Sequence, residues 1–140
     1  DTPYLRFGSP WLATKFFIEK LNMLNLPGVN FKEVEFRPKG SPYYNRVPKY
    51  NGRPCSGIEI SISDKKVVKP LETATSIIAL ISQLHPREFK WEAQGYIDRL
   101  FGSNQLRLFV AQKKPPGYLS PQYMHDEIEF SKFRDTFILY

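Results

Sequence analysis

Two periods of hydrophobic and polar residues run along the 140-residue chain and predict where helices and strands form. Apolar residues recur three and four positions apart in five segments, as on the buried face of a helix. Ile58, Ile60 and Ile62 instead alternate with polar residues, which predicts a strand with one buried face. Charged and apolar residues interleave over 29–36 and predict a second strand. The predicted helices span residues 11–24, 71–84, 96–101, about 104–110, and 120–137.

Capping and turn residues set the expected ends of these elements. Ser9 and Pro10 predict the start of the first helix, as an N-cap followed by a proline at the first helical position. Residues 37–57 hold four prolines, three glycines and three tyrosines and show no helical period. We therefore expect a long loop between the two strands, and long loops inside compact domains usually serve function. A connection of this length leaves the pairing direction of the two strands open.

The order of the predicted elements indicates the fold class. A helix, a strand, a long loop, a second strand and then several helices are typical of an α+β domain whose small sheet is covered by helices. A length of 140 residues and a 41% share of apolar residues fit a single domain, spanning residues 1–140, with one core. The longest apolar runs are shorter than the roughly 18 residues of a membrane span, so none is predicted.

Residues that could carry catalysis or hold a metal are few in this sequence. The single cysteine, Cys55, excludes an internal disulfide framework, and the two histidines lack the spacing of metal ligands. We therefore expect no metal and no cofactor. Glu33 and Glu35 share one strand face and are interpreted as solvated side chains, as are the acidic residues within 126–129. Cys55 is expected to be a small buried side chain, so no catalytic residue is predicted.

The net charge of +6 is concentrated between the two predicted strands. Arg37, Lys39, Arg46, Lys49 and Arg53 lie in one stretch that contains no acidic residue. Three tyrosines and two asparagines lie in the same stretch. A proline-stiffened loop of this composition suits a ligand that has flat or apolar faces, hydroxyl groups and negative charge.

Two classes of ligand fit this loop on the residues alone. Single-stranded nucleic acid would stack its bases on the tyrosines and pair its phosphates with the cations. An anionic sugar polymer would stack its pyranose faces on the same rings and place a carboxylate against an arginine. A third interpretation is a solvated loop that only seals the edge of the sheet.

Several strings of residues, taken in order and spacing, carry a resemblance to a known family over nearly the whole chain. They are Phe7-Gly8-Ser9-Pro10-Trp11, Leu24-Asn25-Leu26-Pro27-Gly28-Val29-Asn30-Phe31, Phe36-Arg37-Pro38, Tyr50-Asn51-Gly52-Arg53-Pro54-Cys55-Ser56-Gly57, Ile58-Glu59-Ile60-Ser61-Ile62-Ser63-Asp64 and Arg134-Asp135-Thr136-Phe137-Ile138-Leu139-Tyr140. In these strings the chain resembles the C-terminal domain of the NamZ-type exo-β-N-acetylmuramidases, long catalogued as a bacterial family of unknown function. Family members often carry a histidine at the position of Ser61, so any role of that histidine is lost or relocated here.

The resemblance implies a two-domain glycoside hydrolase that removes N-acetylmuramic acid from the non-reducing ends of peptidoglycan fragments. In such a protein a Rossmann-like N-terminal domain carries the catalytic glutamate, and the active-site cleft lies between the two domains. This chain resembles only the second, auxiliary domain, so we expect the catalytic glutamate to be absent from it. The chain begins at Asp1 without a signal segment, and we expect it to be a piece of a longer protein. The resemblance implies a secreted or periplasmic location.

The loop and the resemblance together predict which residues bind substrate. Muramic acid differs from glucosamine by a lactyl carboxylate, which a basic, tyrosine-bearing loop facing the cleft could bind. The predicted partners are peptidoglycan fragments or muramic acid glycosides and the N-terminal catalytic domain of the same parent chain, with no nucleic acid and no membrane span. An autonomous carbohydrate- or cell-wall-binding module is the alternative function, ahead of a nucleic-acid-binding domain. The predicted substrate-binding residues are Tyr43, Tyr44, Arg46, Tyr50, Arg53 and Trp11.

Overall fold

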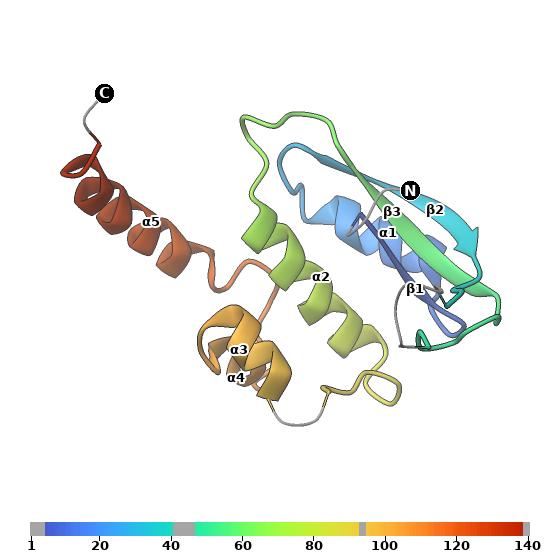
Figure 1. The fold of residues 1–140 in the computed structure, drawn as a ribbon. Coiled ribbons are helices and arrows are strands. Elements are labelled where there is room, and N and C mark those ends of the chain that lie inside the picture. The colour runs from blue at the N-terminus through green and yellow to red at the C-terminus, as the bar shows by residue number, and fades with distance from the viewer. Residues whose placement is uncertain (1–4, 41–46, 93–94, 139–140) are drawn as a thin grey trace.

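The computed structural model describes residues 5–40, 47–92 and 95–138, and within these it contains one three-stranded sheet and five helices (Figure 1). The predicted α+β class, with a small sheet covered by helices, is confirmed. The strands are β1 (Arg6–Ser9), β2 (Val29–Phe36) and β3 (Cys55–Ile62). The helices are α1 (Thr14–Met23), α2 (Pro70–Leu84), α3 (Tyr96–Phe101), α4 (Gln105–Ala111) and α5 (Ser120–Asp135).

Strand β3 lies at the centre of the sheet and pairs antiparallel with both β1 and β2. This register settles the pairing direction that the sequence left open. Ile58 lies opposite Phe7 on one side and Glu33 on the other, and Ile60 lies opposite Phe31. Strand β1 was not predicted, because it has only four residues, includes a glycine and shows no two-residue period.

The predicted start of β3 at Ile58 is wrong, since the strand begins three residues earlier at Cys55. Gly57 makes this extension possible. A Cβ atom placed on it would lie 2.5 Å from the ring of Phe36 and 2.6 Å from the backbone oxygen of Phe7. Only a glycine at this position leaves room both for the backbone of β1 beside β3 and for the Phe36 ring against Gly57.

Helix α2 lies between two hydrophobic clusters and joins the sheet to the C-terminal helices. Ile77 and Leu80 contribute to the first cluster, which fills the space between the sheet, α1 and α2, whereas Ala79 belongs to the second. The buried apolar side chains of α2 are thus divided between two clusters on different faces of the helix. The buried side chains of the first cluster are Leu12, Phe17, Leu21, Ile58, Ile77 and Leu80, and those of the second are Ala79, Leu106, Phe109 and Leu119.

The predicted capping role of Ser9 and Pro10 is wrong, and the difference matters for the site described below. Ser9 is the last residue of β1 and pairs with Ser56, so its backbone is committed to the sheet. Helix α1 therefore begins at Thr14, and Trp11 lies in the connection between β1 and α1. Because Trp11 lies outside the helix, its side chain does not have to point in the direction that a helical position would impose.

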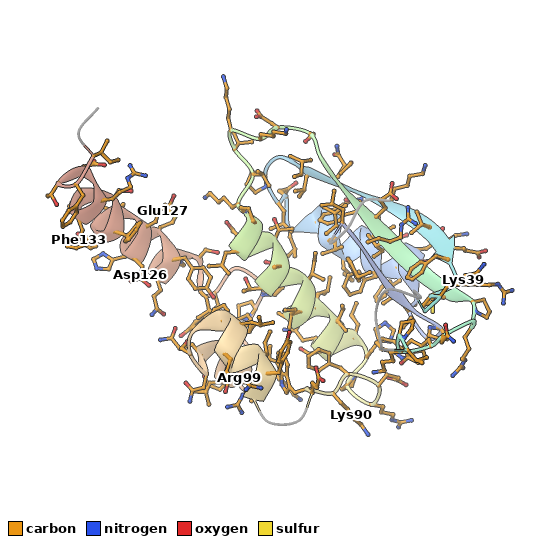
Figure 2. All side chains as sticks on the ribbon, viewed as in Figure 1. Lys39, Lys90, Arg99, Asp126, Glu127 and Phe133 are labelled. Atoms are coloured by element: carbon orange, nitrogen blue, oxygen red, sulfur yellow. The ribbon has the colours of Figure 1, made fainter. Side chains whose placement is uncertain are left out.

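Helix α5 extends away from the rest of the domain (Figures 1 and 2). Asp126 and Glu127 are exposed on it, as predicted for its acidic residues. Its large apolar side chains are exposed as well, with Ile128 at 53% and Phe133 at 62%. In the part of the chain that the structure describes, no helix is both long enough and apolar enough to cross a membrane.

Asp98 of α3 and Arg107 of α4 join the two short helices. Arg107 Nε donates hydrogen bonds to both carboxylate oxygens of Asp98, at 2.7 and 2.9 Å. The hydrogen bond and the charge of this guanidinium hold the pKa of the Asp98 carboxyl below its ordinary value of 3.8. Because the pKa is lower in the folded chain than in the unfolded chain, the pair stabilises the fold at neutral pH and ceases to do so as the pH falls through the folded-state pKa.

We therefore expect Asp98→Asn to lower the thermal midpoint of unfolding at neutral pH. The difference between the variant and the unsubstituted chain should shrink and disappear in acid, where Asp98 is protonated in both the folded and the unfolded chain. Thermal unfolding followed by circular dichroism across this pH range measures the difference. A difference of constant size from neutral to strongly acidic pH would contradict a role for the Asp98 charge.

Candidate functional site

Three of the predicted substrate-binding residues come together at the C-terminal end of α2. Trp11 Nε1 donates a hydrogen bond to Tyr50 Oη at 2.9 Å, although the two residues are 39 positions apart in the chain. The guanidinium carbon of Arg53 lies 5.6 Å from the centre of the Tyr50 ring. The other three predicted residues, Tyr43, Tyr44 and Arg46, lie outside the described residues.

His85 completes this cluster and was not predicted to belong to it. Its imidazole centre lies 5.0 Å from that of the Trp11 ring, with the two planes inclined at 51°. The sequence indicated only that His85 ends a helix, and it is indeed the C-cap residue of α2. No local pattern reveals this contact, because it depends on the position of α2 relative to the connection between β1 and α1.

Two cations lie over the Tyr50 ring. Lys49 Nζ is 5.3 Å and Arg53 Cζ 5.6 Å from its centre, both within the range of a cation–π interaction. Tyr50 is half-buried, whereas Lys49 and Arg53 are exposed. The aromatic ring thus holds two positive charges at the surface of the domain, where an anionic ligand can reach them.

The backbone around Tyr50 is held by residues that follow β2. Gly52 N donates to Pro38 O at 2.8 Å, and Arg37 donates to the Gly52 carbonyl at 3.2 Å. Tyr50 itself has a φ of 62°, a left-handed conformation that costs a non-glycine residue roughly 1 kcal/mol. These hydrogen bonds fix the backbone next to Tyr50, so its side chain is positioned before any ligand binds.

Among the described cations of the acid-free stretch, Arg37 differs from the others, since its guanidinium donates to the Gly52 carbonyl and supports the backbone near Tyr50. Lys39, which follows the C-terminal end of β2 (Figure 2), is exposed. Lys49 and Arg53 are exposed as well. The cations of this stretch that the structure describes therefore divide into one that supports the backbone near Tyr50 and three that present charge at the surface.

Cys55 lies next to this loop and is buried, with 2% of its surface exposed. Its Sγ lies 3.7 Å from the backbone oxygen of Arg53. As predicted for a small buried side chain, Cys55 packs beneath the loop at the start of β3. Its position supports Arg53 and does not present a thiol to solvent.

The carboxylates of β2 are exposed, as the sequence predicted for Glu33 and Glu35. Glu33 Oε1 accepts a hydrogen bond from the hydroxyl of Thr14 on α1. Neither carboxylate is buried in an apolar pocket, which is where the general acid of a glycosidase lies. Among the described residues, no group of three histidine, cysteine, aspartate or glutamate side chains is arranged to hold a metal ion.

The arrangement of Trp11, Tyr50, His85, Lys49 and Arg53, called here the Trp11–Tyr50 cluster, suits binding. Flat rings can lie against the apolar face of a sugar, and the exposed guanidinium can pair with a carboxylate in a two-pronged hydrogen bond. These are the features expected of a surface that recognises an acidic sugar.

Comparison with known proteins shows the family of this chain. Residues 1–140, the whole chain, match the family described as exo-β-N-acetylmuramidase NamZ, C-terminal. The chain belongs to this family. The resemblance predicted from the sequence strings is therefore confirmed.

Two longer proteins contain a region that is similar to this chain in sequence or in fold. The peptidoglycan β-N-acetylmuramidase NamZ of Bacillus subtilis (strain 168) is 28% identical over 138 residues, which are 99% of this chain and 32% of that protein. A crystal structure of a DUF1343 family protein from Bacteroides fragilis NCTC 9343 has the same fold, with a TM-score of 0.80, 20% identity and coverage of 99% of this chain and 35% of that one. The chain thus spans about a third of the length of either relative.

Proposed function

We propose that this NamZ C-terminal domain is the auxiliary, substrate-side domain of a peptidoglycan-processing exo-β-N-acetylmuramidase that acts in a secreted or periplasmic location. The observation that carries the proposal is the Trp11–Tyr50 cluster, an aromatic surface with exposed cations in a chain of this family. Catalysis is assigned to a Rossmann-like domain that precedes this one in the parent chain.

The assignment of catalysis to another domain is supported by what the described residues contain. Glu33 and Glu35, the paired carboxylates of β2, are exposed, and one of them is bound by the Thr14 hydroxyl. A glycosidase needs one carboxyl whose pKa is raised by an apolar pocket. The Bacillus subtilis relative, named as a peptidoglycan β-N-acetylmuramidase, has about two thirds of its length outside the matched region, where such a residue can lie.

Recognition of muramic acid is assigned to Arg53 and the rings beside it. The lactyl carboxylate is the group that distinguishes muramic acid from glucosamine, so a cation that pairs with it selects between the two sugars. A charged hydrogen bond of this kind contributes about 1.5–3 kcal/mol, a tenfold to hundredfold effect on affinity. Tyr50 and Trp11 would contact the sugar ring, which both sugars share.

Substituting Arg53 in the parent enzyme tests this assignment. We expect Arg53→Ala to lower kcat/KM for muramic acid glycosides by about tenfold to hundredfold. The weaker reaction with glucosaminides should be nearly unchanged, because it lacks the carboxylate. Arg46→Ala, at the second candidate arginine, is measured in the same way.

Arg99 provides a matched control, since it is also exposed and lies 5.9 Å from the ring of a tyrosine, Tyr96 of α3. Arg99→Ala should leave both reactions unchanged. Equal losses on the two sugars after Arg53→Ala would indicate a folding defect or a role other than carboxylate recognition. If kcat/KM fell for neither sugar, the loop would have no role in substrate binding and would only cover the edge of the sheet.

An autonomous cell-wall-binding module is the alternative and makes a different prediction in the same variants. A module that only anchors the enzyme would lose binding to insoluble peptidoglycan, while kcat/KM on small soluble glycosides would not change. Measuring both quantities for Arg53→Ala separates the two functions.

A further inference from the structure

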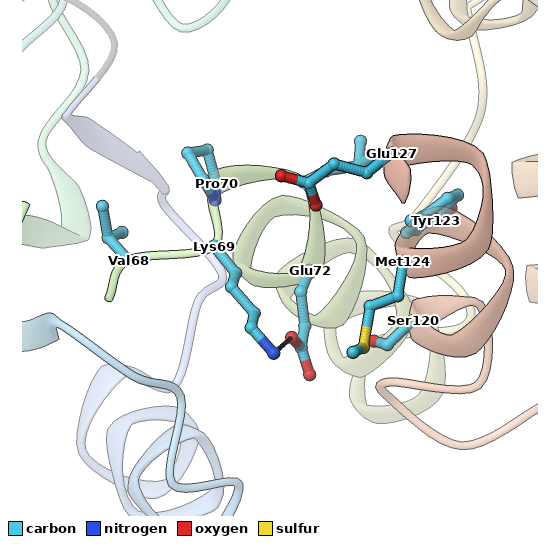
Figure 3. Close-up of a pocket in the computed structure, with 9 residues that line it drawn as sticks. Val68, Lys69, Pro70, Glu72, Ser120, Tyr123, Met124 and Glu127 are labelled. Atoms are coloured by element: carbon cyan, nitrogen blue, oxygen red, sulfur yellow. Dashed lines mark ion pairs between the residues drawn. The ribbon is translucent and has the colours of Figure 1, made fainter. Parts of the chain in front are cut away.

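A continuous apolar surface follows α2 from Ile81, about one turn before His85, past the N-terminal end of the helix to α5. It consists of two neighbouring hollows that share Val68 and Pro70. The first hollow, of about 410 Å³, lies between the sheet and α2, and every residue that lines it is apolar. The second, of about 320 Å³, lies between the start of α2 and α5 (Figure 3).

Large apolar side chains are exposed along both hollows. Ile62 at the end of β3 is 46% exposed and Leu71 at the start of α2 is 45% exposed. Met124, which lines the second hollow, is 50% exposed, and Ile128, one helical turn further along α5, is 53% exposed. Contiguous apolar surface of this kind is typical of an interface, whereas isolated exposed apolar residues are ordinary. We call this region the α2–α5 apolar surface.

Polar groups at the second hollow also lack partners within this domain. Among the described residues, the hydroxyls of Ser120 and Tyr123 are buried and have no hydrogen-bond partner. Burial raises the pKa of Tyr123 to about 12. Lys69 and Glu72 form an ion pair, 3.8 Å apart, at the rim (Figure 3). An apolar centre with a charged rim and unsatisfied hydroxyls matches the anatomy of a protein–protein interface.

The position of β1 indicates which protein segment covers this surface. Leu5, the residue before β1, lines the first hollow, so polypeptide that precedes the domain reaches it at the edge of the α2–α5 apolar surface. About two thirds of the length of the Bacillus subtilis relative lies outside its match to this chain, and the matching family is that of a C-terminal region. The largest body of protein tethered to this domain is therefore attached at this surface.

We propose that the α2–α5 apolar surface docks against the domain that precedes this one in the same chain. The proposal rests on the proposed function, which places a larger domain there. The first hollow extends along α2 as far as Ile81, so the docking surface ends about one helical turn before His85 of the Trp11–Tyr50 cluster. A preceding domain that rests on this surface would therefore also face the Trp11–Tyr50 cluster across a cleft.

Site-specific photo-crosslinking in the full-length parent protein tests the docking. The photoreactive amino acid p-benzoylphenylalanine is placed at position 62 or 128, where the natural side chain is half exposed and the fold tolerates a larger one. Position 61 is the matched control, since Ser61 is exposed and points to the opposite face of β3. We expect positions 62 and 128 to form crosslinks within one chain to peptides of the preceding domain. Position 61 should form no such crosslink.

Two results would overturn the proposal. Crosslinks that join two chains, seen as a band of doubled mass, would show that a second copy covers the surface. Crosslinks of equal yield from positions 61 and 62, or none from 62 and 128, would show that the preceding domain does not dock there.

A second measurement does not depend on crosslinking chemistry. Ile62→Glu in the full-length protein should shift the docking equilibrium toward the undocked state by about tenfold or more, because a carboxylate would enter an apolar interface. Hydrogen exchange of the backbone amides of α2 should then quicken, while Ser61→Glu leaves it unchanged. Unchanged exchange in Ile62→Glu would contradict the docking. Neither measurement depends on hydrolysis. A protein that docks but has no muramidase activity would therefore refute the proposed function and leave the docking proposal standing.

Discussion

Trp11→Ala in the full-length hydrolase is expected to lower kcat/KM for muramic acid glycosides and for glucosaminides alike by about thirtyfold or more. Trp11 supplies a ring to the binding surface and also positions Tyr50 through the 2.9 Å hydrogen bond from its indole nitrogen. Truncating a central tryptophan of a binding surface costs about 2–4 kcal/mol. Both substrates present the same sugar ring to this surface, so kcat/KM should fall for both.

Two conservative variants separate the roles of Trp11. Tyr50→Phe removes the hydroxyl that accepts the indole hydrogen bond and keeps both rings, so it should cause a smaller loss than Trp11→Ala. Trp11→Phe keeps a ring and removes the donor, and it should behave in the same way. Since Trp11 also packs against the first core, rates are corrected for the folded fraction. A folded Trp11→Ala enzyme with unchanged kcat/KM on both sugars would contradict the assignment.

Gly57→Ala is expected to destabilise the domain by about 3 kcal/mol, since the added methyl group would overpack a dense contact. The new Cβ would lie 2.5 Å from the ring of Phe36 and 2.6 Å from the backbone oxygen of Phe7. Relieving the second contact requires the backbone of β1 to move, which would disturb its pairing with β3. For a domain of this size the thermal midpoint should fall by roughly 10 °C. Circular dichroism during heating measures the change.

Gly40→Ala is the matched control for this prediction. Gly40 lies in the connection between β2 and β3, where a Cβ atom would meet only the Pro48 ring, at 3.8 Å, which is ordinary contact. Its thermal midpoint should therefore change little. Equal effects of the two substitutions, or a neutral Gly57→Ala, would show that the close approach of β1, β3 and Phe36 does not hold in solution.

Elements with a strong internal period were predictable from the sequence. Strand β2 and helix α3 have the predicted bounds, and α2 begins within one residue of its predicted start, because each is set by local spacing and by turn residues at its ends. The start of α1 was not predictable, since Ser9 and Pro10 have the local pattern of a cap but Ser9 is paired with Ser56 in the sheet. A long-range strand pairing overrode a local capping preference at that position.

The site shows the same division between local and long-range information. The cations and Tyr50 could be selected from the sequence because they share one loop of unusual composition. The contact between Trp11 and His85 could not, because the residues lie 74 positions apart in the chain numbering and meet only through the packing of α2 against the β1–α1 connection. The exposed apolar residues of α5 were likewise invisible as a surface, since in a sequence they resemble the residues of a core.

Nuclear magnetic resonance of the two tryptophan side chains tests the central claim most directly. The chain contains two tryptophans, Trp11 in the cluster and Trp91 beside the second core, so its nitrogen-15 spectrum holds two indole N–H signals. Titration with a muramic acid glycoside should move the Trp11 signal and leave the Trp91 signal in place, and the matching glucosaminide should move the Trp11 signal much less. A Trp11 signal that the muramic acid glycoside does not move, or that both sugars move equally, would contradict recognition of the lactyl carboxylate by this surface.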